Sequence, residues 1–93
     1  MAQQNKLGHR HTVVSESHGY QRVAYHKTEV VKWNRQRIVL NSGGFRSSTT
    51  KTRMNQASNQ FGLGYRVFAT KGEWFVEHRH RIVAFRDNIT LDR

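Results

Sequence analysis

Short runs in which apolar and polar residues alternate make up most of this 93-residue chain. Alternation with a period of two is typical of β-strands, because successive side chains point to opposite faces of a sheet. Residues 25–33 and 37–42 show this pattern, and the polar residues 34–37 between them suit a hairpin loop. An earlier strand is expected over residues 20–26. The pattern in the first half of the chain therefore predicts antiparallel hairpins.

Further strands are expected in the second half of the chain, over residues 64–70, 73–78, 81–85 and 89–91. Lys71–Gly72 separates the first two, and Gly72 supplies the positive φ that a tight turn requires. Asp87–Asn88 predicts another turn, just before the last strand. The chain has no proline, so lysine and arginine are expected to protect the exposed sheet edges.

One α-helix is predicted over about residues 49–61. Met54, Ala57 and Phe61 are spaced three and four positions apart and form one apolar stripe. The other faces are polar and partly basic, and they carry Lys51, Arg53, Asn55, Gln56, Asn59 and Gln60. The pattern indicates a helix that buries one narrow seam.

Both ends of this helix have recognisable signals. Ser48 or Thr49 is expected to cap its start, because a hydroxyl there accepts a hydrogen bond from a backbone amide two or three residues later. Gly62 is expected to end the helix in a left-handed conformation, with Leu63 folding back onto the last turn.

These elements predict an α+β fold in which a small antiparallel β-sheet of hairpins packs against a single helix. Trp33, Phe61 and Trp74 are assigned to its core. Residues 12–93 are expected to form one small domain, since a chain of this length has room for one core. Residues 1–11 lack any pattern and are expected to be a flexible basic tail.

Composition narrows the classes of protein to consider. The chain contains no cysteine, which excludes disulfides and thiolate metal sites. Apolar residues make up 35% of it, which is lean but enough for a folded domain. No run approaches the ~20 apolar residues of a membrane helix, and the polar start lacks the apolar segment of a signal peptide. A soluble protein of a reducing compartment, without a membrane partner, is expected.

The formal net charge of +10 is the strongest functional signal. No carboxylate occurs between Val30 and Gly72, although that segment holds eight lysine and arginine residues. Such a segment produces a positive potential that attracts polyanions. A charge excess kept for solubility is the alternative, but acidic surfaces serve solubility better. The charge therefore favours a polyanionic or acidic partner.

The segment NSGGFRSSTTKTRMNQ, residues 41–56, leads from two glycines through hydroxyl-bearing and basic residues into the helix. The free amides and the positive dipole end of a helix N-terminus favour an anion. The same residues suit an ordinary turn and helix cap, and Ser48 and Thr49 are assigned to that structural role. The spacing does not match G-x-x-x-x-G-K-[ST], so nucleotide hydrolysis is not expected. The segment is a candidate phosphate cradle.

The residues predicted to contact nucleic acid each carry a positive charge, a hydroxyl donor or an aromatic ring. They are Arg35, Arg37, Arg46, Ser47, Thr50, Lys51, Arg53, Tyr65 and Arg66. Phe68, Trp74 and Phe75 on neighbouring strands could also stack on unpaired bases. In a chain with so few large apolar residues most aromatic rings are needed for the core, so Tyr65 alone is kept as a contact.

Two His-x-His pairs, His9 with His11 and His78 with His80, raise the question of a metal site. Residues two apart on a strand point the same way, so His78 and His80 could share a cation. Neither pair has a carboxylate or cysteine at a characteristic spacing, so neither a metal nor another cofactor is expected. No catalytic arrangement of side chains can be argued from spacing either, and an enzyme is not expected.

Residues 25–76 resemble a group of small proteins encoded by tailed bacteriophages. The shared pattern is a Y-H-x-T-x-V strand, an L-x-S-G-G turn, the sequence T-T-K-x-R-M-N-Q, and a G-x-x-V-x-x-x-x-x-x-W-F-V hairpin. The resemblance implies a phage origin and a site of action in the cytoplasm of an infected bacterium. It implies no particular biochemical activity.

Two functions from different classes fit these observations. One is a nucleic-acid-binding module, DNA or RNA, whose basic centre contacts phosphate. The other is an interaction protein that docks on an acidic surface of a host protein and alters its activity. The clustering of hydroxyl and amide donors with the basic residues favours the first, whereas a large exposed apolar patch would favour the second.

Overall fold

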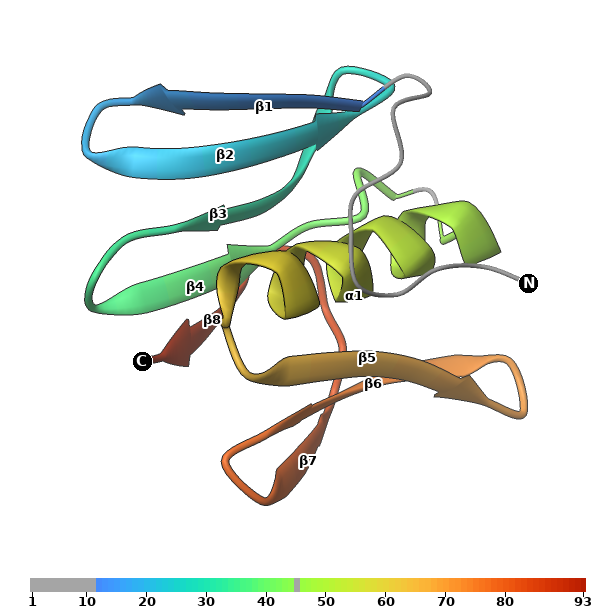
Figure 1. Cartoon of the computed structure of the whole chain (residues 1–93). Helices are drawn as coiled ribbons and strands as arrows, with labels where there is room; N and C mark the ends of the chain where they lie inside the picture. The colour runs from blue at the N-terminus through green and yellow to red at the C-terminus, as the bar shows by residue number, and fades with distance from the viewer. Residues whose placement is uncertain (1–11, 45) are drawn as a thin grey trace.

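A computed structural model describes residues 12–44 and 46–93, which form β-strands and one α-helix (Figure 1). The strands are β1 (Thr12–Ser17), β2 (Tyr20–Tyr25), β3 (Thr28–Trp33), β4 (Arg37–Leu40), β5 (Tyr65–Thr70), β6 (Glu73–His78), β7 (Arg81–Ala84) and β8 (Ile89–Asp92). The helix is α1 (Ser48–Phe61). The α+β class and its single helix are confirmed for the described part of the chain. The tail predicted over residues 1–11 lies outside the described residues.

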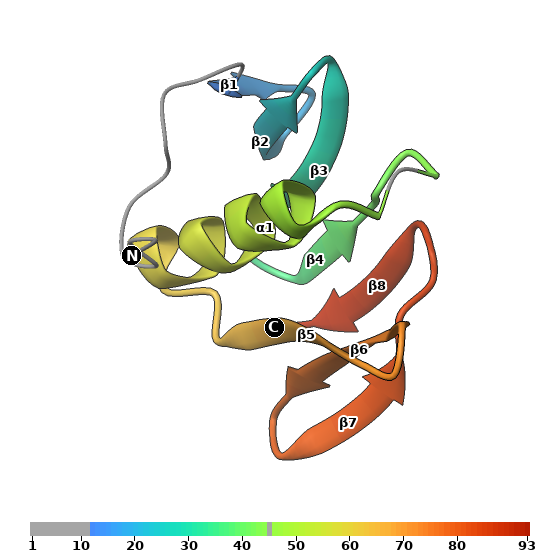
Figure 2. The ribbon, with the colours of Figure 1, turned by 90° about the vertical axis from the view of Figure 1, so that its right-hand side faces the viewer.

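The strands form two antiparallel sheets rather than one. A five-stranded sheet has the order β1-β2-β3-β4-β8, and a three-stranded sheet has the order β5-β6-β7. Helix α1 lies between them, with β2 and β3 on one side and β5 on the other (Figures 1 and 2). The last strand, β8, returns to the five-stranded sheet beside β4. No helix in the described part of the chain is long and apolar enough to cross a membrane.

The core fills the space between the helix and the two sheets. Met54 and Ala57 are fully buried on α1, and Trp33 and Trp74 are buried on β3 and β6, as predicted. Phe61 is half-buried, and its ring centre lies 4.8 Å from that of Trp33. The apolar stripe of the helix therefore faces the core, as the spacing of its residues indicates.

The helix starts one residue earlier than the predicted caps. Ser47 is the N-cap residue, and its hydroxyl accepts a hydrogen bond from the Thr50 N–H at 3.1 Å. The assignment of Ser48 or Thr49 as the cap was wrong, because both already lie within the helix.

The helix ends as its sequence predicts. Gly62 adopts a left-handed conformation with φ 65°. The N–H of Leu63 donates to the carbonyl of Ser58 at 2.9 Å, which folds the chain back over the last turn. Leu63 is buried, so this ending also adds an apolar contact.

Polar side chains of α1 attach the three-stranded sheet to the helix. Asn55 donates to the Val67 carbonyl and accepts from the Val67 N–H, both at 2.8 Å. Ser58 Oγ donates to the Tyr65 carbonyl at 2.7 Å and accepts from the Tyr65 N–H at 3.0 Å. These side chains satisfy backbone groups on the edge of β5 that pairs with no other strand among the described residues.

The helix buries a wider surface than the single apolar seam that its sequence predicts, because it packs against both sheets. Asn55 is half-buried and Gln56 is only 4% exposed, although both were assigned to polar outer faces. A helix enclosed by two sheets buries two faces, and its polar residues on the second face must then find hydrogen-bond partners.

Candidate nucleic-acid interface

The glycine turn of the candidate phosphate cradle binds a carboxylate of the chain itself. The N–H and the hydroxyl of Ser42 donate to Asp87 Oδ1 at 2.8 and 2.6 Å, and the Gly44 N–H donates to Asp87 Oδ2 at 3.2 Å. Ser42 is only 2% exposed, so its polar groups depend on Asp87. Asp87, rather than a phosphate of a ligand, therefore occupies the glycine turn.

Asp87, which the sequence predicts only as part of a turn, is a structural anion. Burial alone would raise the pKa of Asp87, but hydrogen bonds from Ser42 and Gly44, together with the charge of Arg46, lower it below its usual value. The signal for this role was the glycine pair, since a turn with positive φ values can aim backbone amides at one anion, here those of Ser42 and Gly44.

Two basic side chains lie over aromatic rings at the start of α1. The Arg46 guanidinium lies 5.0 Å from the centre of the Phe85 ring, and Lys51 Nζ lies 5.9 Å from the centre of the Trp74 ring. Trp74 and Phe85 contact each other edge to face, with ring centres 5.4 Å apart. The two rings thus support both charges, through cation–π contacts.

Backbone donors lie beside these charges. The first amides of a helix have no partner within the helix, and the first turn of α1 contains no acidic residue. Ser48 and Thr49 are exposed in this turn, as is Arg46 just before it. We call Arg46, Ser48, Thr49 and Lys51 the helix-start site. Its N–H groups and cations would stabilise a bound anion such as phosphate.

Ser47 and Thr50 do not belong to this site, although both were predicted contacts. The Ser47 hydroxyl caps the helix and lies 2.9 Å from Thr50 Oγ1. Thr50 is only 2% exposed, so its hydroxyl cannot reach a ligand. Both hydroxyls therefore have a structural role at the start of the helix, the alternative that the sequence left open for this segment.

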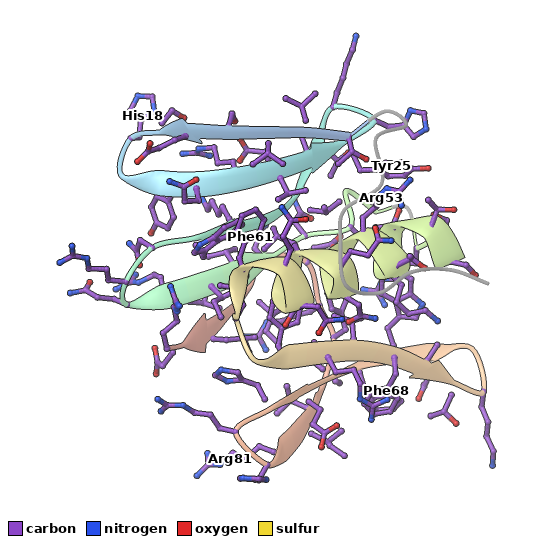
Figure 3. The ribbon with its side chains drawn as sticks, in the orientation of Figure 1. His18, Tyr25, Arg53, Phe61, Phe68 and Arg81 are labelled. Atoms are coloured by element: carbon purple, nitrogen blue, oxygen red, sulfur yellow. The ribbon has the colours of Figure 1, made fainter. Side chains whose placement is uncertain are left out.

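Arg53 connects the helix to the five-stranded sheet. Its Nε donates to Thr12 Oγ1 and its Nη1 donates to Gln56 Oε1, both at 3.0 Å. Its guanidinium lies 5.5 Å from the centre of the Tyr25 ring, and Figure 3 shows the two residues side by side. Arg53 is therefore occupied by contacts within the protein.

Replacing Arg53 with alanine is expected to lower the free energy of unfolding by about 1–2 kcal/mol, because two hydrogen bonds and the contact with Tyr25 are lost. Urea denaturation would measure the change. An unchanged free energy of unfolding would contradict this structural role.

Tyr65 and Arg66 also have partners within the protein. Tyr65 is only 5% exposed, and its hydroxyl donates to the Met54 carbonyl, so the prediction that it stacks on a base was wrong. Burial raises the pKa of Tyr65 well above its usual value. Arg66 is exposed, but it forms an ion pair with Glu77 at 2.9 Å and lies over the Phe68 ring.

Arg35 and Arg37 lie away from the helix-start site. Arg35 is exposed in the turn between β3 and β4, and Arg37 is the exposed first residue of β4. Helix α1 begins beyond the opposite end of β4 (Figure 1). The basic residues predicted to bind nucleic acid together therefore lie apart, with Arg35 and Arg37 near the start of β4 and the helix-start site beyond its end.

The two described histidines of the His-x-His pairs do not share a strand face. His78 is the last residue of β6, whereas His80 lies in the following turn with φ 66°. The argument from strand alternation was therefore wrong for this pair. Burial and the charge of Arg79 lower the pKa of His78, against the opposing effect of Asp92. His9 and His11 lie outside the described residues.

Comparison with known proteins agrees with the phage resemblance of the sequence. No curated protein and no solved structure matches the chain. The model of the family described as Kyanoviridae Gp96 protein matches residues 1–92, nearly the whole chain. The chain therefore belongs to the Kyanoviridae Gp96 protein family, a family of phage proteins.

Proposed function

We propose that this phage protein binds nucleic acid without catalysing a reaction, and that its helix-start site contacts backbone phosphates. The observation that carries this proposal is the placement of Arg46 and Lys51 over Trp74 and Phe85, beside the first amides of α1. Cations and amide donors gathered in this way suit phosphate oxygens and carry no information about base sequence. The protein would act in the cytoplasm of the bacterial host, and its function requires no cofactor.

The charge of the rest of the molecule supports the proposal. Within residues 12–44 and 46–93, Arg22 pairs with Glu29 at 2.6 Å and Arg66 pairs with Glu77 at 2.9 Å. These two pairs neutralise only two of the basic residues. The formal net charge of the whole chain is +10. A field of this sign accelerates the encounter with a polyanion and makes its binding sensitive to salt.

Replacing Arg46 or Lys51 with alanine is expected to weaken binding by a similar factor for every nucleic-acid sequence. Each lost phosphate contact should also flatten the dependence of log K on log salt, by about 0.7 for a single strand or about 0.9 for a duplex. Fluorescence anisotropy with labelled oligonucleotides at several salt concentrations measures both quantities.

Two variants are controls for this experiment. Arg86→Ala removes an exposed charge outside the helix-start site and should change binding little. Ser47→Ala removes the helix cap, and it should cost about 1 kcal/mol of stability without changing the salt dependence. If the wild type binds but Arg46→Ala and Lys51→Ala bind equally well with the same salt dependence, the helix-start site is not the contact.

Binding to an acidic surface of a host protein is a second candidate. Strand β7 lies at the edge of the three-stranded sheet, and its Ile82 and Val83 are 59% and 43% exposed. An exposed edge strand can pair with a strand of another protein, and Arg79 and Arg81 would favour an acidic one. If the wild type binds no oligonucleotide, this candidate predicts that Ile82→Lys abolishes co-purification of a host protein from infected cells.

A further inference from the structure

We propose that the face of the five-stranded sheet turned away from α1 binds single-stranded nucleic acid, with Tyr20 stacking on a base and Lys32 and Arg37 contacting flanking phosphates. This inference rests on the proposed nucleic-acid binding, and it names the ligand and a second contact surface. We call this surface, defined by Tyr20, Arg22, Lys32 and Arg37, the outer sheet face.

Strand alternation separates the outer sheet face from the core. Val31 and Trp33 on β3 and Ile38 on β4 are buried on the side of the sheet that α1 covers. Successive residues of a strand point to opposite faces, so their neighbours Lys32 and Arg37 point away from the helix. No prediction from sequence had placed Lys32 in a binding site.

The register of β2 and β3 brings two basic residues together on this face. Arg22 lies directly opposite Lys32, and both lie over the Tyr20 ring, at 5.7 and 5.1 Å from its centre. Like charges directly opposite each other destabilise a sheet. Arg22 forms an ion pair with Glu29 at 2.6 Å, which neutralises it and leaves the charge of Lys32 for a bound phosphate.

The outer sheet face keeps an excess of positive charge. Besides Glu29, the acidic residue that shares this face in the described part of the chain is Asp92, which lies opposite Arg37 in the register of β4 and β8. Lys27 and Arg35 are exposed in the turns at the two ends of β3 and add two positive charges. Charge on this face thus complements a phosphate backbone.

The aromatic pair on the three-stranded sheet fits nucleic acid less well. Phe68 and Phe75 stack there with ring centres 5.7 Å apart, on the face turned away from α1. Glu73 and Glu77 project from β6 on that same face, where Arg66 is the basic residue of β5. On the strands of this face two carboxylates accompany one arginine, which suits a phosphate backbone less well than the outer sheet face does, so the pair is not assigned to the interface.

The shape of the outer sheet face favours a single strand over a duplex. The major groove of a duplex is commonly read by a helix or a two-stranded ribbon that projects into it. A sheet face without such a projection can instead accept unpaired bases on an aromatic side chain, while basic residues follow the backbone. Tyr20 is half-buried, and a base that stacks on its ring would lie beside the cations of Arg22 and Lys32.

The test is fluorescence anisotropy with a labelled oligothymidylate of roughly 20 nucleotides, which is longer than the ~4–16 nucleotides that one OB-fold domain covers. Tyr20→Leu should weaken binding about 5- to 150-fold without changing the salt dependence, because stacking is lost and charge is kept. Tyr20→Phe retains the ring and should bind nearly as well as the wild type. Lys32→Ala should flatten the salt dependence by about 0.7.

Arg37→Ala and Arg81→Ala form a matched pair. Each variant replaces an exposed arginine that is the first residue of a four-residue strand. Arg37 lies on the five-stranded sheet, whereas Arg81 lies on the three-stranded sheet (Figure 3). Arg37→Ala should flatten the salt dependence, and Arg81→Ala should leave it unchanged.

Two outcomes would overturn this inference while nucleic-acid binding itself stands. One is a wild type that binds single strands but loses no affinity in Tyr20→Leu and Lys32→Ala, with both variants shown to be folded by circular dichroism. The other is a duplex of the same length that binds as tightly as the single strand, when Tyr20→Leu changes neither of the two affinities. A wild type that binds no oligonucleotide at low salt would overturn the proposed function as well.

Discussion

Replacing Asp87 with alanine is expected to lower the free energy of unfolding by about 3 kcal/mol. The carboxylate of Asp87 accepts the N–H and the hydroxyl of Ser42 and the N–H of Gly44. Without it, the buried polar groups of Ser42 lose their partner, and a buried unsatisfied donor costs more than the bond itself contributes. Urea denaturation at neutral pH measures this loss.

The same contact predicts a dependence of stability on pH. The pKa of Asp87 in the folded protein is lower than its unperturbed value of 3.8. The stabilisation by this carboxylate is therefore fully present above pH 3.8 and is lost as the pH falls through the folded pKa. Asp87→Asn should remove this part of the acid sensitivity, whereas Asp92→Ala, which replaces an exposed carboxylate, should keep it. A wild type and an Asp87→Asn variant with the same acid sensitivity would contradict the role of Asp87.

Replacing Asn55 with alanine is expected to lower the free energy of unfolding by about 2–3 kcal/mol, since both hydrogen bonds to the Val67 backbone are lost. The effect should be strongest in the three-stranded sheet, because Asn55 attaches β5 to the helix. Hydrogen exchange should therefore show faster exchange of the β5 and β6 amides in this variant.

Asn55→Asp and Thr49→Ala sharpen this test. Asn55→Asp keeps an acceptor for the Val67 N–H but places a carboxylate against the Val67 carbonyl, so it should destabilise the protein as well. Thr49→Ala changes an exposed residue of the same helix and should cost little. Equal exchange in the wild type and Asn55→Ala would mean that the attachment of β5 does not depend on Asn55.

The helix and the strands other than β1 were predictable because each depends on local spacing. Met54, Ala57 and Phe61 share one helix face whatever surrounds them, and Gly62 ends the helix through its own backbone freedom. Strand β1 was missed because Val13 and Val14 are adjacent and both exposed, which gives no alternating signal. Its position depends instead on the hairpin that it forms with β2.

The candidate site was harder to predict because its contacts join residues distant in the sequence. Ser42 binds Asp87, which lies 45 residues further along the chain, and Arg53 binds Thr12, which lies 41 residues before it. Composition showed which side chains could meet a phosphate, but not which of them already had partners in the folded chain. The outer sheet face was missed for a related reason, since it depends on the register that places Arg22 opposite Lys32.

The most direct test of nucleic-acid binding is the salt dependence of wild-type affinity for a labelled single strand. Anisotropy titrations at several salt concentrations should give a log K that falls linearly with log salt. The slope should be about 0.7 for each phosphate contacted. An affinity that does not change with salt, or no binding even at low salt, would contradict the account.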